Sequence, residues 1–416
     1  MKYCNLIKKS SRQAWLIPTI SILLSNCSMP KAEKTKDKLT FDVPQGYMDE
    51  AEDIPDFWLS TIDEINDFVK DRVKKGHVEI CGTSAGGRPI LSVSYGKGRE
   101  GVGTTTFSGS LSVSGVKHYR GKDSDKLVYM GLAGVHGFEL ESIVGVINMI
   151  EVLETGKDLN GKAWPELSAM LDSVDRIVLL PLVNPDGRAR FPIRMEPNRG
   201  GDADSFTVHE YLNTGGKKDG SIIGWPEVKE YIPMDFAQFG FPGGYPNDAG
   251  VNIMHDDFFG SPQPETRMLF DLTATEKPDL IINMHTGVPK DEYYMHVLRP
   301  FTESKLQPVF DALYTKITTA LVNNKLQGSI AAVADVDPSR RKASGYNLNT
   351  ALNLHCGALC VVIESPSHGY YGTDLAGQPV VQSPEMLLDA QLIAHQEALK
   401  FLLETKGRTG WEEKGN

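Results

Sequence analysis

Residues 126–153 have the sequence KLVYMGLAGVHGFELESIVGVINMIEVL, which predicts a strand, a tight turn and a helix in immediate succession. The segment 126–131 is a short apolar run of the kind found in buried strands. From Glu139 to Leu153 apolar residues recur at helical spacing, so an amphipathic helix is expected there. His136 therefore lies just after a strand, and Glu139 lies in the first helical turn.

Further apolar runs bounded by polar or turn residues predict buried strands at 177–183, 280–284 and 359–363. Residues 77–95 look like two short strands around a glycine-rich turn. The last helix is expected to begin with Ser383 as its cap and to end at Gly407. Strands that alternate with helices predict a three-layer α/β/α domain with a mixed, mostly parallel central sheet.

Two histidines and a glutamate form a candidate metal site. His136 and Glu139 are separated by a turn that lets both side chains point at one centre, and His285 directly follows the strand predicted at 280–284. Functional sites of open α/β sheets lie at the carboxyl ends of the strands. Catalytic zinc commonly takes three N/O ligands from the protein. Each residue also has an ordinary interpretation, because His-x-x-Glu arises by chance and a core histidine can bond to a backbone carbonyl.

Glu364 is a fourth residue of the same kind, since it ends the apolar run 359–363 abruptly with a carboxylate. It could be a solvent-facing strand terminus. In the company of the other three residues it is a candidate general base.

These features resemble the zinc carboxypeptidases of the funnelin type over about residues 55–405. The matching segments are Gly82-Thr83-Ser84-Ala85-Gly86-Gly87-Arg88-Pro89-Ile90, His136-x-x-Glu139, Pro181-Leu182-Val183-Asn184-Pro185-Asp186-Gly187, His285 and Glu364. The resemblance implies hydrolysis of a peptide or peptide-like amide with one Zn²⁺ per chain, held by His136, Glu139 and His285. It implies that Glu364 acts as general base and then as proton donor to the leaving amine. It also implies an oxyanion-stabilising arginine, for which Arg199 is the first candidate and Arg194 the second.

The departures from the family pattern concern the substrate. Gly137-Phe138 replaces the family's usual Ser-Arg, and Met254-His255 replaces the Asn-Arg pair that clamps a terminal carboxylate. A histidine cannot reproduce the bidentate donors of an arginine at neutral pH. Tyr346 is a candidate substitute for the family's tyrosine, and Arg194 and His255 are the other candidate substrate-binding residues. A zinc amidase or deacylase acting on N-acyl amino acids or γ-linked peptides, and a non-catalytic surface binding lipoprotein, remain as alternatives.

The N-terminal segment predicts export. Residues 1–26 combine basic residues with an apolar run at 14–24, too short to span a bilayer, and Leu24-Ser25-Asn26-Cys27 resembles a lipoprotein box. We therefore expect a signal peptide over 1–26, a lipid anchor on Cys27 in the outer membrane or periplasm, and a tether over 27–46. A plain secretory signal is the alternative. The catalytic domain is expected at 47–410, with 194–250 as an extended loop insertion.

Composition narrows the range of partners. The net charge of -11 over 416 residues makes nucleic acid an improbable partner, because phosphate binding requires a basic face. No obligate protein partner is implied, and five cysteines are too few for a disulfide framework. Ser84 lies in a Gly-x-Ser-x-Gly sequence, but a serine-hydrolase elbow needs a helix after it and a strand is expected there instead. A disulfide between Cys356 and Cys360 is conceivable, with buried thiols as the default.

Overall fold

The computed structural model describes residues 41–100, 123–201, 203–224, 227–229, 233–287, 295–326, 345–373 and 378–413. The expected signal peptide, Cys27 and the tether up to residue 40 lie outside the described residues. Phe41 and Val43 pack against the main core, so the folded body starts before residue 47. It also continues beyond residue 410, because helix α11 (Gly407–Glu413) contains the buried Trp411.

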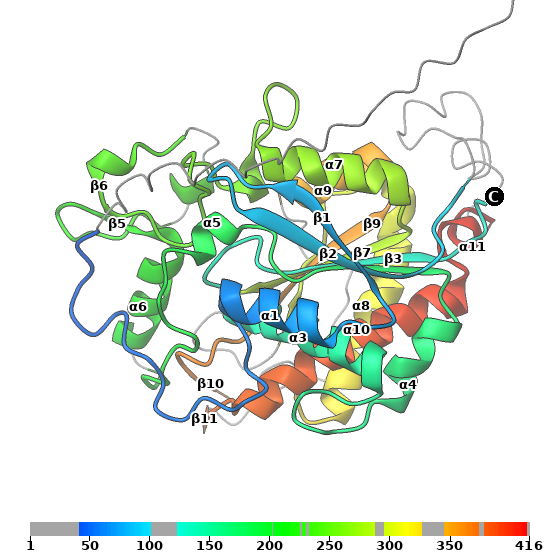
Figure 1. The fold of residues 1–416 in the computed structure, drawn as a ribbon, viewed down its shortest axis with the longest axis horizontal. Coiled ribbons are helices and arrows are strands. Elements are labelled where there is room, and N and C mark those ends of the chain that lie inside the picture. Colours follow the sequence, from blue (N-terminus) through cyan, green and yellow to red (C-terminus); the bar gives the residue numbers. More distant parts are fainter. Residues whose placement is uncertain are drawn as a thin grey trace, which may run out of the picture. The chain divides into compact units, whose positions relative to one another are not determined.

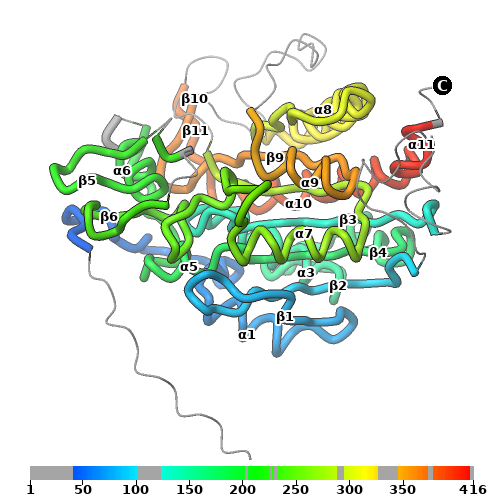
Figure 2. The backbone as a smooth tube through the Cα atoms, turned by 90° about the horizontal axis from the view of Figure 1, so that it is seen from above, coloured from blue at the N-terminus to red at the C-terminus, as the bar shows by residue number. Residues whose placement is uncertain are grey.

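A seven-stranded sheet forms the middle layer. Its spatial order is β1 (His77–Thr83), β2 (Pro89–Gly96), β4 (Arg176–Leu180), β3 (Val128–Leu132), β7 (Leu280–Thr286), β9 (Leu359–Ser365) and β8 (His296–Val297). The central strands β4, β3, β7 and β9 are parallel, whereas β2 and β8 run antiparallel to their neighbours. Figure 2 shows β1, β2, β3 and β9 following one another across the molecule. The predicted mixed central sheet is confirmed, with parallel pairing limited to its four central strands.

Helices cover both faces of this sheet (Figure 1). One face carries α1 (Ile62–Arg72), α3 (Leu140–Thr155), α8 (Gln307–Asn323) and α10 (Pro384–Thr405), and the other carries α7 (Pro264–Glu276) and α9 (Leu348–Cys356). Two hydrophobic clusters fill the two interfaces between the layers. The shorter elements are α4 (Pro165–Ser168), α5 (Pro185–Arg188), β10 (Gly372–Thr373), β11 (Pro379–Val380) and the 3₁₀ turns Ala169–Asp172, Ile253–His255 and Ser304–Leu306.

Local sequence signals set several helix ends. Thr61 and Glu64 form a reciprocal capping box at the start of α1. Ser383 caps α10 by accepting a hydrogen bond from the backbone N–H of Met386, with Pro384 in the first helical position, as predicted. The expected end at Gly407 is wrong by a short distance. The helix ends at Thr405, Lys406 takes a left-handed conformation, and Gly407 starts α11.

Helix α3 is less amphipathic than its sequence predicts, because it is buried on all sides from Leu140 to Glu154. Helices α1 and α10 both pack against α3, and α10 also contacts the sheet. The acidic side chains of α3 have partners within the protein: Glu151 pairs with Arg72, and Glu154 accepts hydrogen bonds from the backbone at 74–76. The polar side of the predicted helix therefore contacts protein and not solvent.

The segment 194–250 is more structured than the extended loop expected from its composition. It contains α6 (Ala203–Thr214), a two-stranded antiparallel sheet of β5 (Gly216–Lys217) and β6 (Phe239–Phe241), and 3₁₀ turns at Glu227–Lys229 and Phe236–Gln238. Figures 1 and 2 both place α6, β5 and β6 together at one end of the sheet, away from α11. The helix escaped prediction because few of its residues are apolar, with Val208, Tyr211 and Leu212 buried.

Ser84 lies in the turn of the β1–β2 hairpin, where its hydroxyl donates to Asp186 Oδ1 at 2.6 Å. A strand follows it and not a helix, as predicted, so this serine lacks the setting of a nucleophile elbow. Cys356 and Cys360 are buried free thiols.

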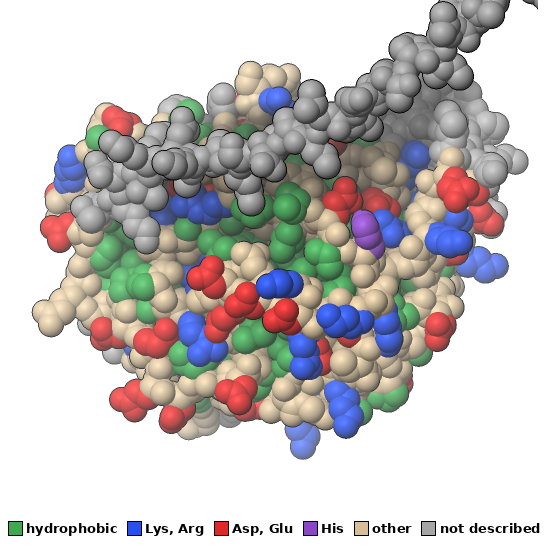
Figure 3. Space-filling view, viewed as in Figure 1, with side chains coloured by type: hydrophobic (Ala, Val, Ile, Leu, Met, Phe, Trp, Pro, Cys, Tyr) green, Lys and Arg blue, Asp and Glu red, His purple; other side chains and the backbone are tan. Residues whose placement is uncertain are grey.

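The described surface in Figure 3 carries interspersed acidic and basic side chains, with hydrophobic side chains grouped between them. Edge strand β1 exposes Val78 and Ile80. Among the described helices, none combines the length and the apolar character that crossing a membrane would require.

Candidate metal centre

Strands β7 and β9 place His285 and Glu364 side by side. Side chains alternate along a strand, so Leu280, Ile282 and Met284 pack against the α3–α10 layer while Ile281 packs on the opposite face. His285 follows the same alternation as Ile281, and Glu364 has the corresponding position on β9. The parallel register pairs His285 directly with Glu364. Both side chains therefore leave the sheet on one face at the carboxyl ends of their strands.

The turn after β3 brings His136 and Glu139 to the same end of the sheet. Gly134 has φ +59°, which favours glycine, and Gly137 passes against the backbone of α5. A Cβ at Gly137 would lie 2.1 Å from the backbone nitrogen of Arg188. The Gly137 N–H donates to the carbonyl of Gly244 at 2.8 Å. This glycine is therefore required by close packing.

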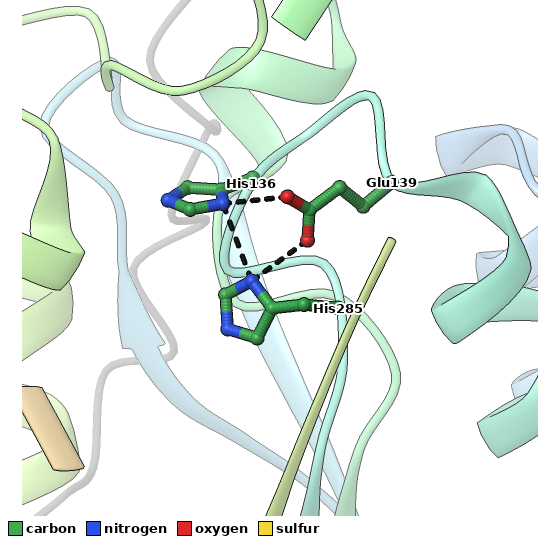
Figure 4. A group of neighbouring side chains, drawn as sticks. All are labelled: His136, Glu139 and His285. Carbon is green, nitrogen blue, oxygen red and sulfur yellow. Dashed lines mark hydrogen bonds and ion pairs between the residues drawn. The ribbon is translucent and has the colours of Figure 1, made fainter. Parts of the chain in front are cut away.

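His136, Glu139 and His285 converge on one point (Figure 4). His136 Nδ1 lies 2.7 Å from Glu139 Oε1, and His285 Nδ1 lies 2.7 Å from Glu139 Oε2. The two Nδ1 atoms are 3.2 Å apart. All three residues are buried. The three residues thus form a compact triangle, in which Glu139 reaches the two imidazoles through different oxygens.

The charges of this triangle are strongly coupled. Burial opposes ionisation of Glu139, but the two imidazoles outweigh it and lower its pKa to about 2. Burial lowers the pKa of His136, which favours the neutral imidazole that can bind a metal ion. Burial also opposes the charged form of His285, but the adjacent Glu139 raises its pKa overall. A divalent cation bound here would displace any proton on the two facing nitrogens, because a metal ligand must be deprotonated.

The donor set fits zinc. The ligand atoms of a tetrahedral zinc ion lie about 3.3 Å apart. The ligand atoms that these three residues offer all lie within 4.8 Å of one another. Asn252 Oδ1 lies 3.1 Å from His136 Nε2 and can accept its hydrogen, which leaves Nδ1 with a free lone pair. Asn252 is itself held, because its amide donates to the carbonyl of Val228 and its Oδ1 also accepts from the N–H of Met254.

Glu364 is half-buried beside this centre, and burial raises its pKa to about 7. The neighbouring Glu139 charge acts in the same direction, while His285 and His209 oppose it. Gly287 leaves space in front of the carboxylate, since a Cβ there would lie 2.9 Å from Glu364 Oε2. A carboxyl group with such a pKa can accept and return a proton near neutral pH.

A cavity of about 580 Å³ opens over the centre, and it is lined by His136, His285 and Glu364. Two of the predicted substrate-binding residues, His255 and Tyr346, also line it. None of the described lining residues is an arginine or a lysine. The described part of the cavity therefore offers no permanently charged cation.

The structure does not bring Arg194 or Arg199 into this lining. The guanidinium of Arg194 pairs with Glu64 and donates to the carbonyl of Trp58. Arg199 pairs with Glu196 at 3.1 Å and donates to the carbonyls of Gly46 and Tyr47. Arg199 therefore lies outside the described cavity lining, because Glu196 and the carbonyls of Gly46 and Tyr47 occupy its donors.

Sequence reasoning missed the residues that the 194–252 region supplies to the site. Tyr245 stacks on His136 with 3.7 Å between ring centroids and 14° between planes. Asn252 contacts the same imidazole, and His209 and Asn213 of α6 line the cavity. The segment Gly243-Gly244-Tyr245-Pro246 was an available signal. Both of its glycines lack room for a Cβ, and Gly244 is in contact with Phe138.

An α/β sheet with two imidazoles and a carboxylate at its strand ends, beside a further carboxylate, defines the class of mononuclear metal-dependent hydrolases. The family model for zinc carboxypeptidases matches residues 59–323, and the chain belongs to this zinc-dependent family. It is thus a metallocarboxypeptidase-like hydrolase.

Solved structures agree at the level of the fold. The chain is similar to a metallo-carboxypeptidase from Burkholderia cenocepacia, with 15% identity, a TM-score of 0.50 and coverage of 83% of this chain and 70% of that one. It is also similar to carboxypeptidase A from Helicoverpa armigera, with 13% identity, a TM-score of 0.48 and coverage of 86% and 76%. No curated protein sequence gives a significant match.

Proposed function

We propose that this protein hydrolyses a peptide or peptide-like amide, with His136, Glu139 and His285 holding one zinc ion and Glu364 acting as general base. The observation that carries the proposal is the triangle of His136, Glu139 and His285, whose polar atoms contact one another at 2.7, 2.7 and 3.2 Å, with Glu364 in register beside it. When bound, zinc supplies a Lewis acid that polarises a carbonyl group and makes water more acidic.

The role of Glu364 follows from its position and its charge. It lines the same cavity as His136 and His285, and its pKa of about 7 suits proton transfer at neutral pH. Glu364 would take a proton from the attacking water as the new C–O bond forms. It would return this proton to the amide nitrogen as the C–N bond breaks, so that a carboxylic acid and an amine leave.

The substrate is less constrained than the reaction. A carboxypeptidase that reads a free C-terminus needs a cation for the terminal carboxylate. Met254 and His255 replace the expected Asn-Arg pair, and no described residue of the cavity lining supplies another arginine. This observation favours, as a second candidate, an amidase or deacylase that acts on N-acyl amino acids or γ-linked peptides.

A substrate panel distinguishes these candidates. It contains N-acetylated dipeptides with a free C-terminus, the same dipeptides as C-terminal amides, N-acyl amino acids and γ-linked dipeptides. Hydrolysis should disappear with a chelator and return with Zn²⁺. The His285→Ala variant should bind no zinc, whereas His77→Gln, at an exposed position on β1, should bind one zinc per chain. Full zinc occupancy in His285→Ala would contradict the ligand assignment.

We also propose that the protein is exported and anchored through a lipid on Cys27. The support is the segment of residues 1–27, with its basic start, its apolar run and Leu24-Ser25-Asn26-Cys27. Labelled palmitate should be incorporated into the wild-type chain in a bacterial host and not into Cys27→Ala. Equal labelling of the two chains would exclude this anchor.

A further inference from the structure

Helix α6 presents a stripe of side chains to the cavity. Phe206, His209, Glu210, Asn213 and Thr214 all line it, and their spacing corresponds to one face of a helix. His209 has an imidazole that can carry a positive charge, and none of the described lining residues is an arginine or a lysine. The role of this imidazole is not explained by the metal centre or by Glu364.

A buried carboxylate holds His209 in place. His209 Nδ1 lies 2.8 Å from Glu196 Oε2, and both side chains are at least 95% buried. Glu196 Oε1 pairs with Arg199, and Glu196 Oε2 also accepts from the hydroxyl of Ser367. Glu196 therefore links Arg199 to His209, and His209 is the member of this series that lines the cavity.

The surroundings of His209 favour its charged form. Burial alone would lower its pKa, but Glu196 outweighs this effect and the pKa is raised overall. The carboxylates of Glu141 and Glu139 act in the same direction. A positive charge on His209 in turn affects the reacting centre, because it lowers the pKa of Glu364.

The second ring nitrogen of His209 is also occupied. His209 Nε2 lies 2.9 Å from the side-chain amide of Asn213, whose Oδ1 is buried without a hydrogen-bond partner. Exchanging the amide oxygen and nitrogen by rotation lets Oδ1 accept from Nε2–H, as a doubly protonated imidazole requires. With Nδ1 facing Glu196 and Nε2 facing Asn213 in this way, both N–H groups of a protonated His209 have acceptors, and neither ring nitrogen is free for proton transfer.

We propose that the imidazolium of His209, held by Glu196 and Asn213, supplies the positive charge that stabilises the oxyanion developing on the substrate carbonyl. This inference rests on the proposed function and assigns to His209 the part that the family resemblance assigned to Arg199. A fixed charge on a buried side chain acts strongly on charge that develops nearby during the reaction, because little water screens it. Arg199 contributes indirectly, because it neutralises one oxygen of Glu196 while His209 takes the other.

The His209→Gln variant tests this role in the zinc-loaded enzyme, with His77→Gln as the matched control. The assay uses an N-acetylated dipeptide with a free C-terminus and the same dipeptide as its C-terminal amide. For each of these two dipeptides that the wild type hydrolyses, we expect kcat to fall about 100-fold in His209→Gln. Zinc content and thermal unfolding should be unchanged. The same KM in wild type and variant would mark an effect on the transition state.

Several outcomes would overturn the proposal. Activity of His209→Gln within about threefold of wild type would remove His209 from the reaction. A loss confined to KM and to the free-acid dipeptide would make His209 a carboxylate-binding residue instead. If the wild type hydrolyses no substrate of the panel in a zinc-dependent reaction, the proposed function itself fails. This outcome can be told apart from the two results above.

A measurement without turnover covers the case in which His209→Gln fails to fold. Imidazole NMR signals of wild type and Glu196→Gln, each assigned by comparison with His209→Gln or by isotope labelling, give the pKa of His209 directly. We expect His209 to be protonated at pH 7 in the wild type and to titrate at lower pH in Glu196→Gln. A neutral His209 at pH 7 in the wild type would overturn the proposal.

Discussion

At the scale of single residues, the chemistry depends on which atoms are left without an internal partner. Glu139 joins two imidazoles that face each other through their Nδ1 atoms, an arrangement that a shared cation satisfies better than hydrogen atoms do. Glu364 lies beside them with no hydrogen bond to the triangle, and burial raises its pKa. The general base thus differs from the ligands in position. It also differs from the ligand Glu139 in its pKa, which is raised in Glu364 and lowered in Glu139.

Glu364→Gln should lose most turnover and keep zinc. The amide cannot accept the proton from water, so kcat should fall by about 10²- to 10⁴-fold. Metal analysis of the purified variant should still give one zinc per chain, because the triangle does not include Glu364. Wild-type kcat in this variant would remove Glu364 from the mechanism.

Gly137→Ala should destabilise the protein. The added Cβ would lie 2.1 Å from Arg188 N and 2.2 Å from Gly187 C, and these backbone atoms cannot move aside easily. We expect the free energy of unfolding to fall by about 2–3 kcal/mol in urea titrations. Gly345→Ala is the control, because its Cβ would meet nothing within 4 Å and its unfolding midpoint should match wild type.

At the scale of elements, a helix or strand could be predicted where its sequence signal lies within one short stretch of the chain. The strands β3, β7 and β9 are short apolar runs buried on both faces, so their positions and the residues that end them could be predicted from sequence. Helix α6 is mostly polar, and the contacts of Tyr245 and Asn252 with His136 join residues more than 100 positions apart. Such contacts depend on tertiary packing and have no periodic signature. Arg199 shows the same limit, since its position along the chain does not determine where its side chain points.

Asn252→Ala should weaken zinc binding although Asn252 lies outside the triangle. Removing Oδ1 takes away the acceptor that orients His136, and such losses typically cost about 10- to 100-fold in metal affinity. Competition with a chromophoric chelator measures the change. Asn252→Asp retains an acceptor oxygen and should bind zinc more tightly than Asn252→Ala. Equal affinity in wild type and Asn252→Ala would show that His136 is oriented without Asn252.

At the scale of the whole molecule, the two interfaces of the sheet have different roles. The ends of β7 and β9 direct His285 and Glu364 out on the α7–α9 side, while the larger α3–α10 interface holds most of the apolar core. Within that core, His395 of α10 is fully buried, and its Nδ1 lies 2.6 Å from the hydroxyl of Tyr129 on β3. Neutral imidazole accepts this hydrogen bond, whereas protonated imidazole would be a buried charge without a carboxylate among its hydrogen-bond partners.

This burial makes stability depend on pH, because it lowers the pKa of His395 to about 4 from an ordinary value of 6.5. Above pH 6.5 neither the folded nor the unfolded chain protonates this residue, and its contribution to stability is fully present. As the pH falls from 6.5 to about 4, the unfolded chain binds a proton that the folded chain does not, so stability is lost. The loss levels off below pH 4.

His395→Gln should remove this dependence, since the Gln oxygen can accept from Tyr129 and does not titrate. Urea unfolding of metal-free wild type and variant at pH 7 and pH 4 gives the comparison. The stability of wild type relative to variant should fall by about 3 kcal/mol between these pH values. Buried Glu141, whose pKa burial raises to about 7, is common to both proteins and cancels in this difference. A difference that stays constant from pH 7 to pH 4 would mean that His395 becomes protonated without opposing the fold.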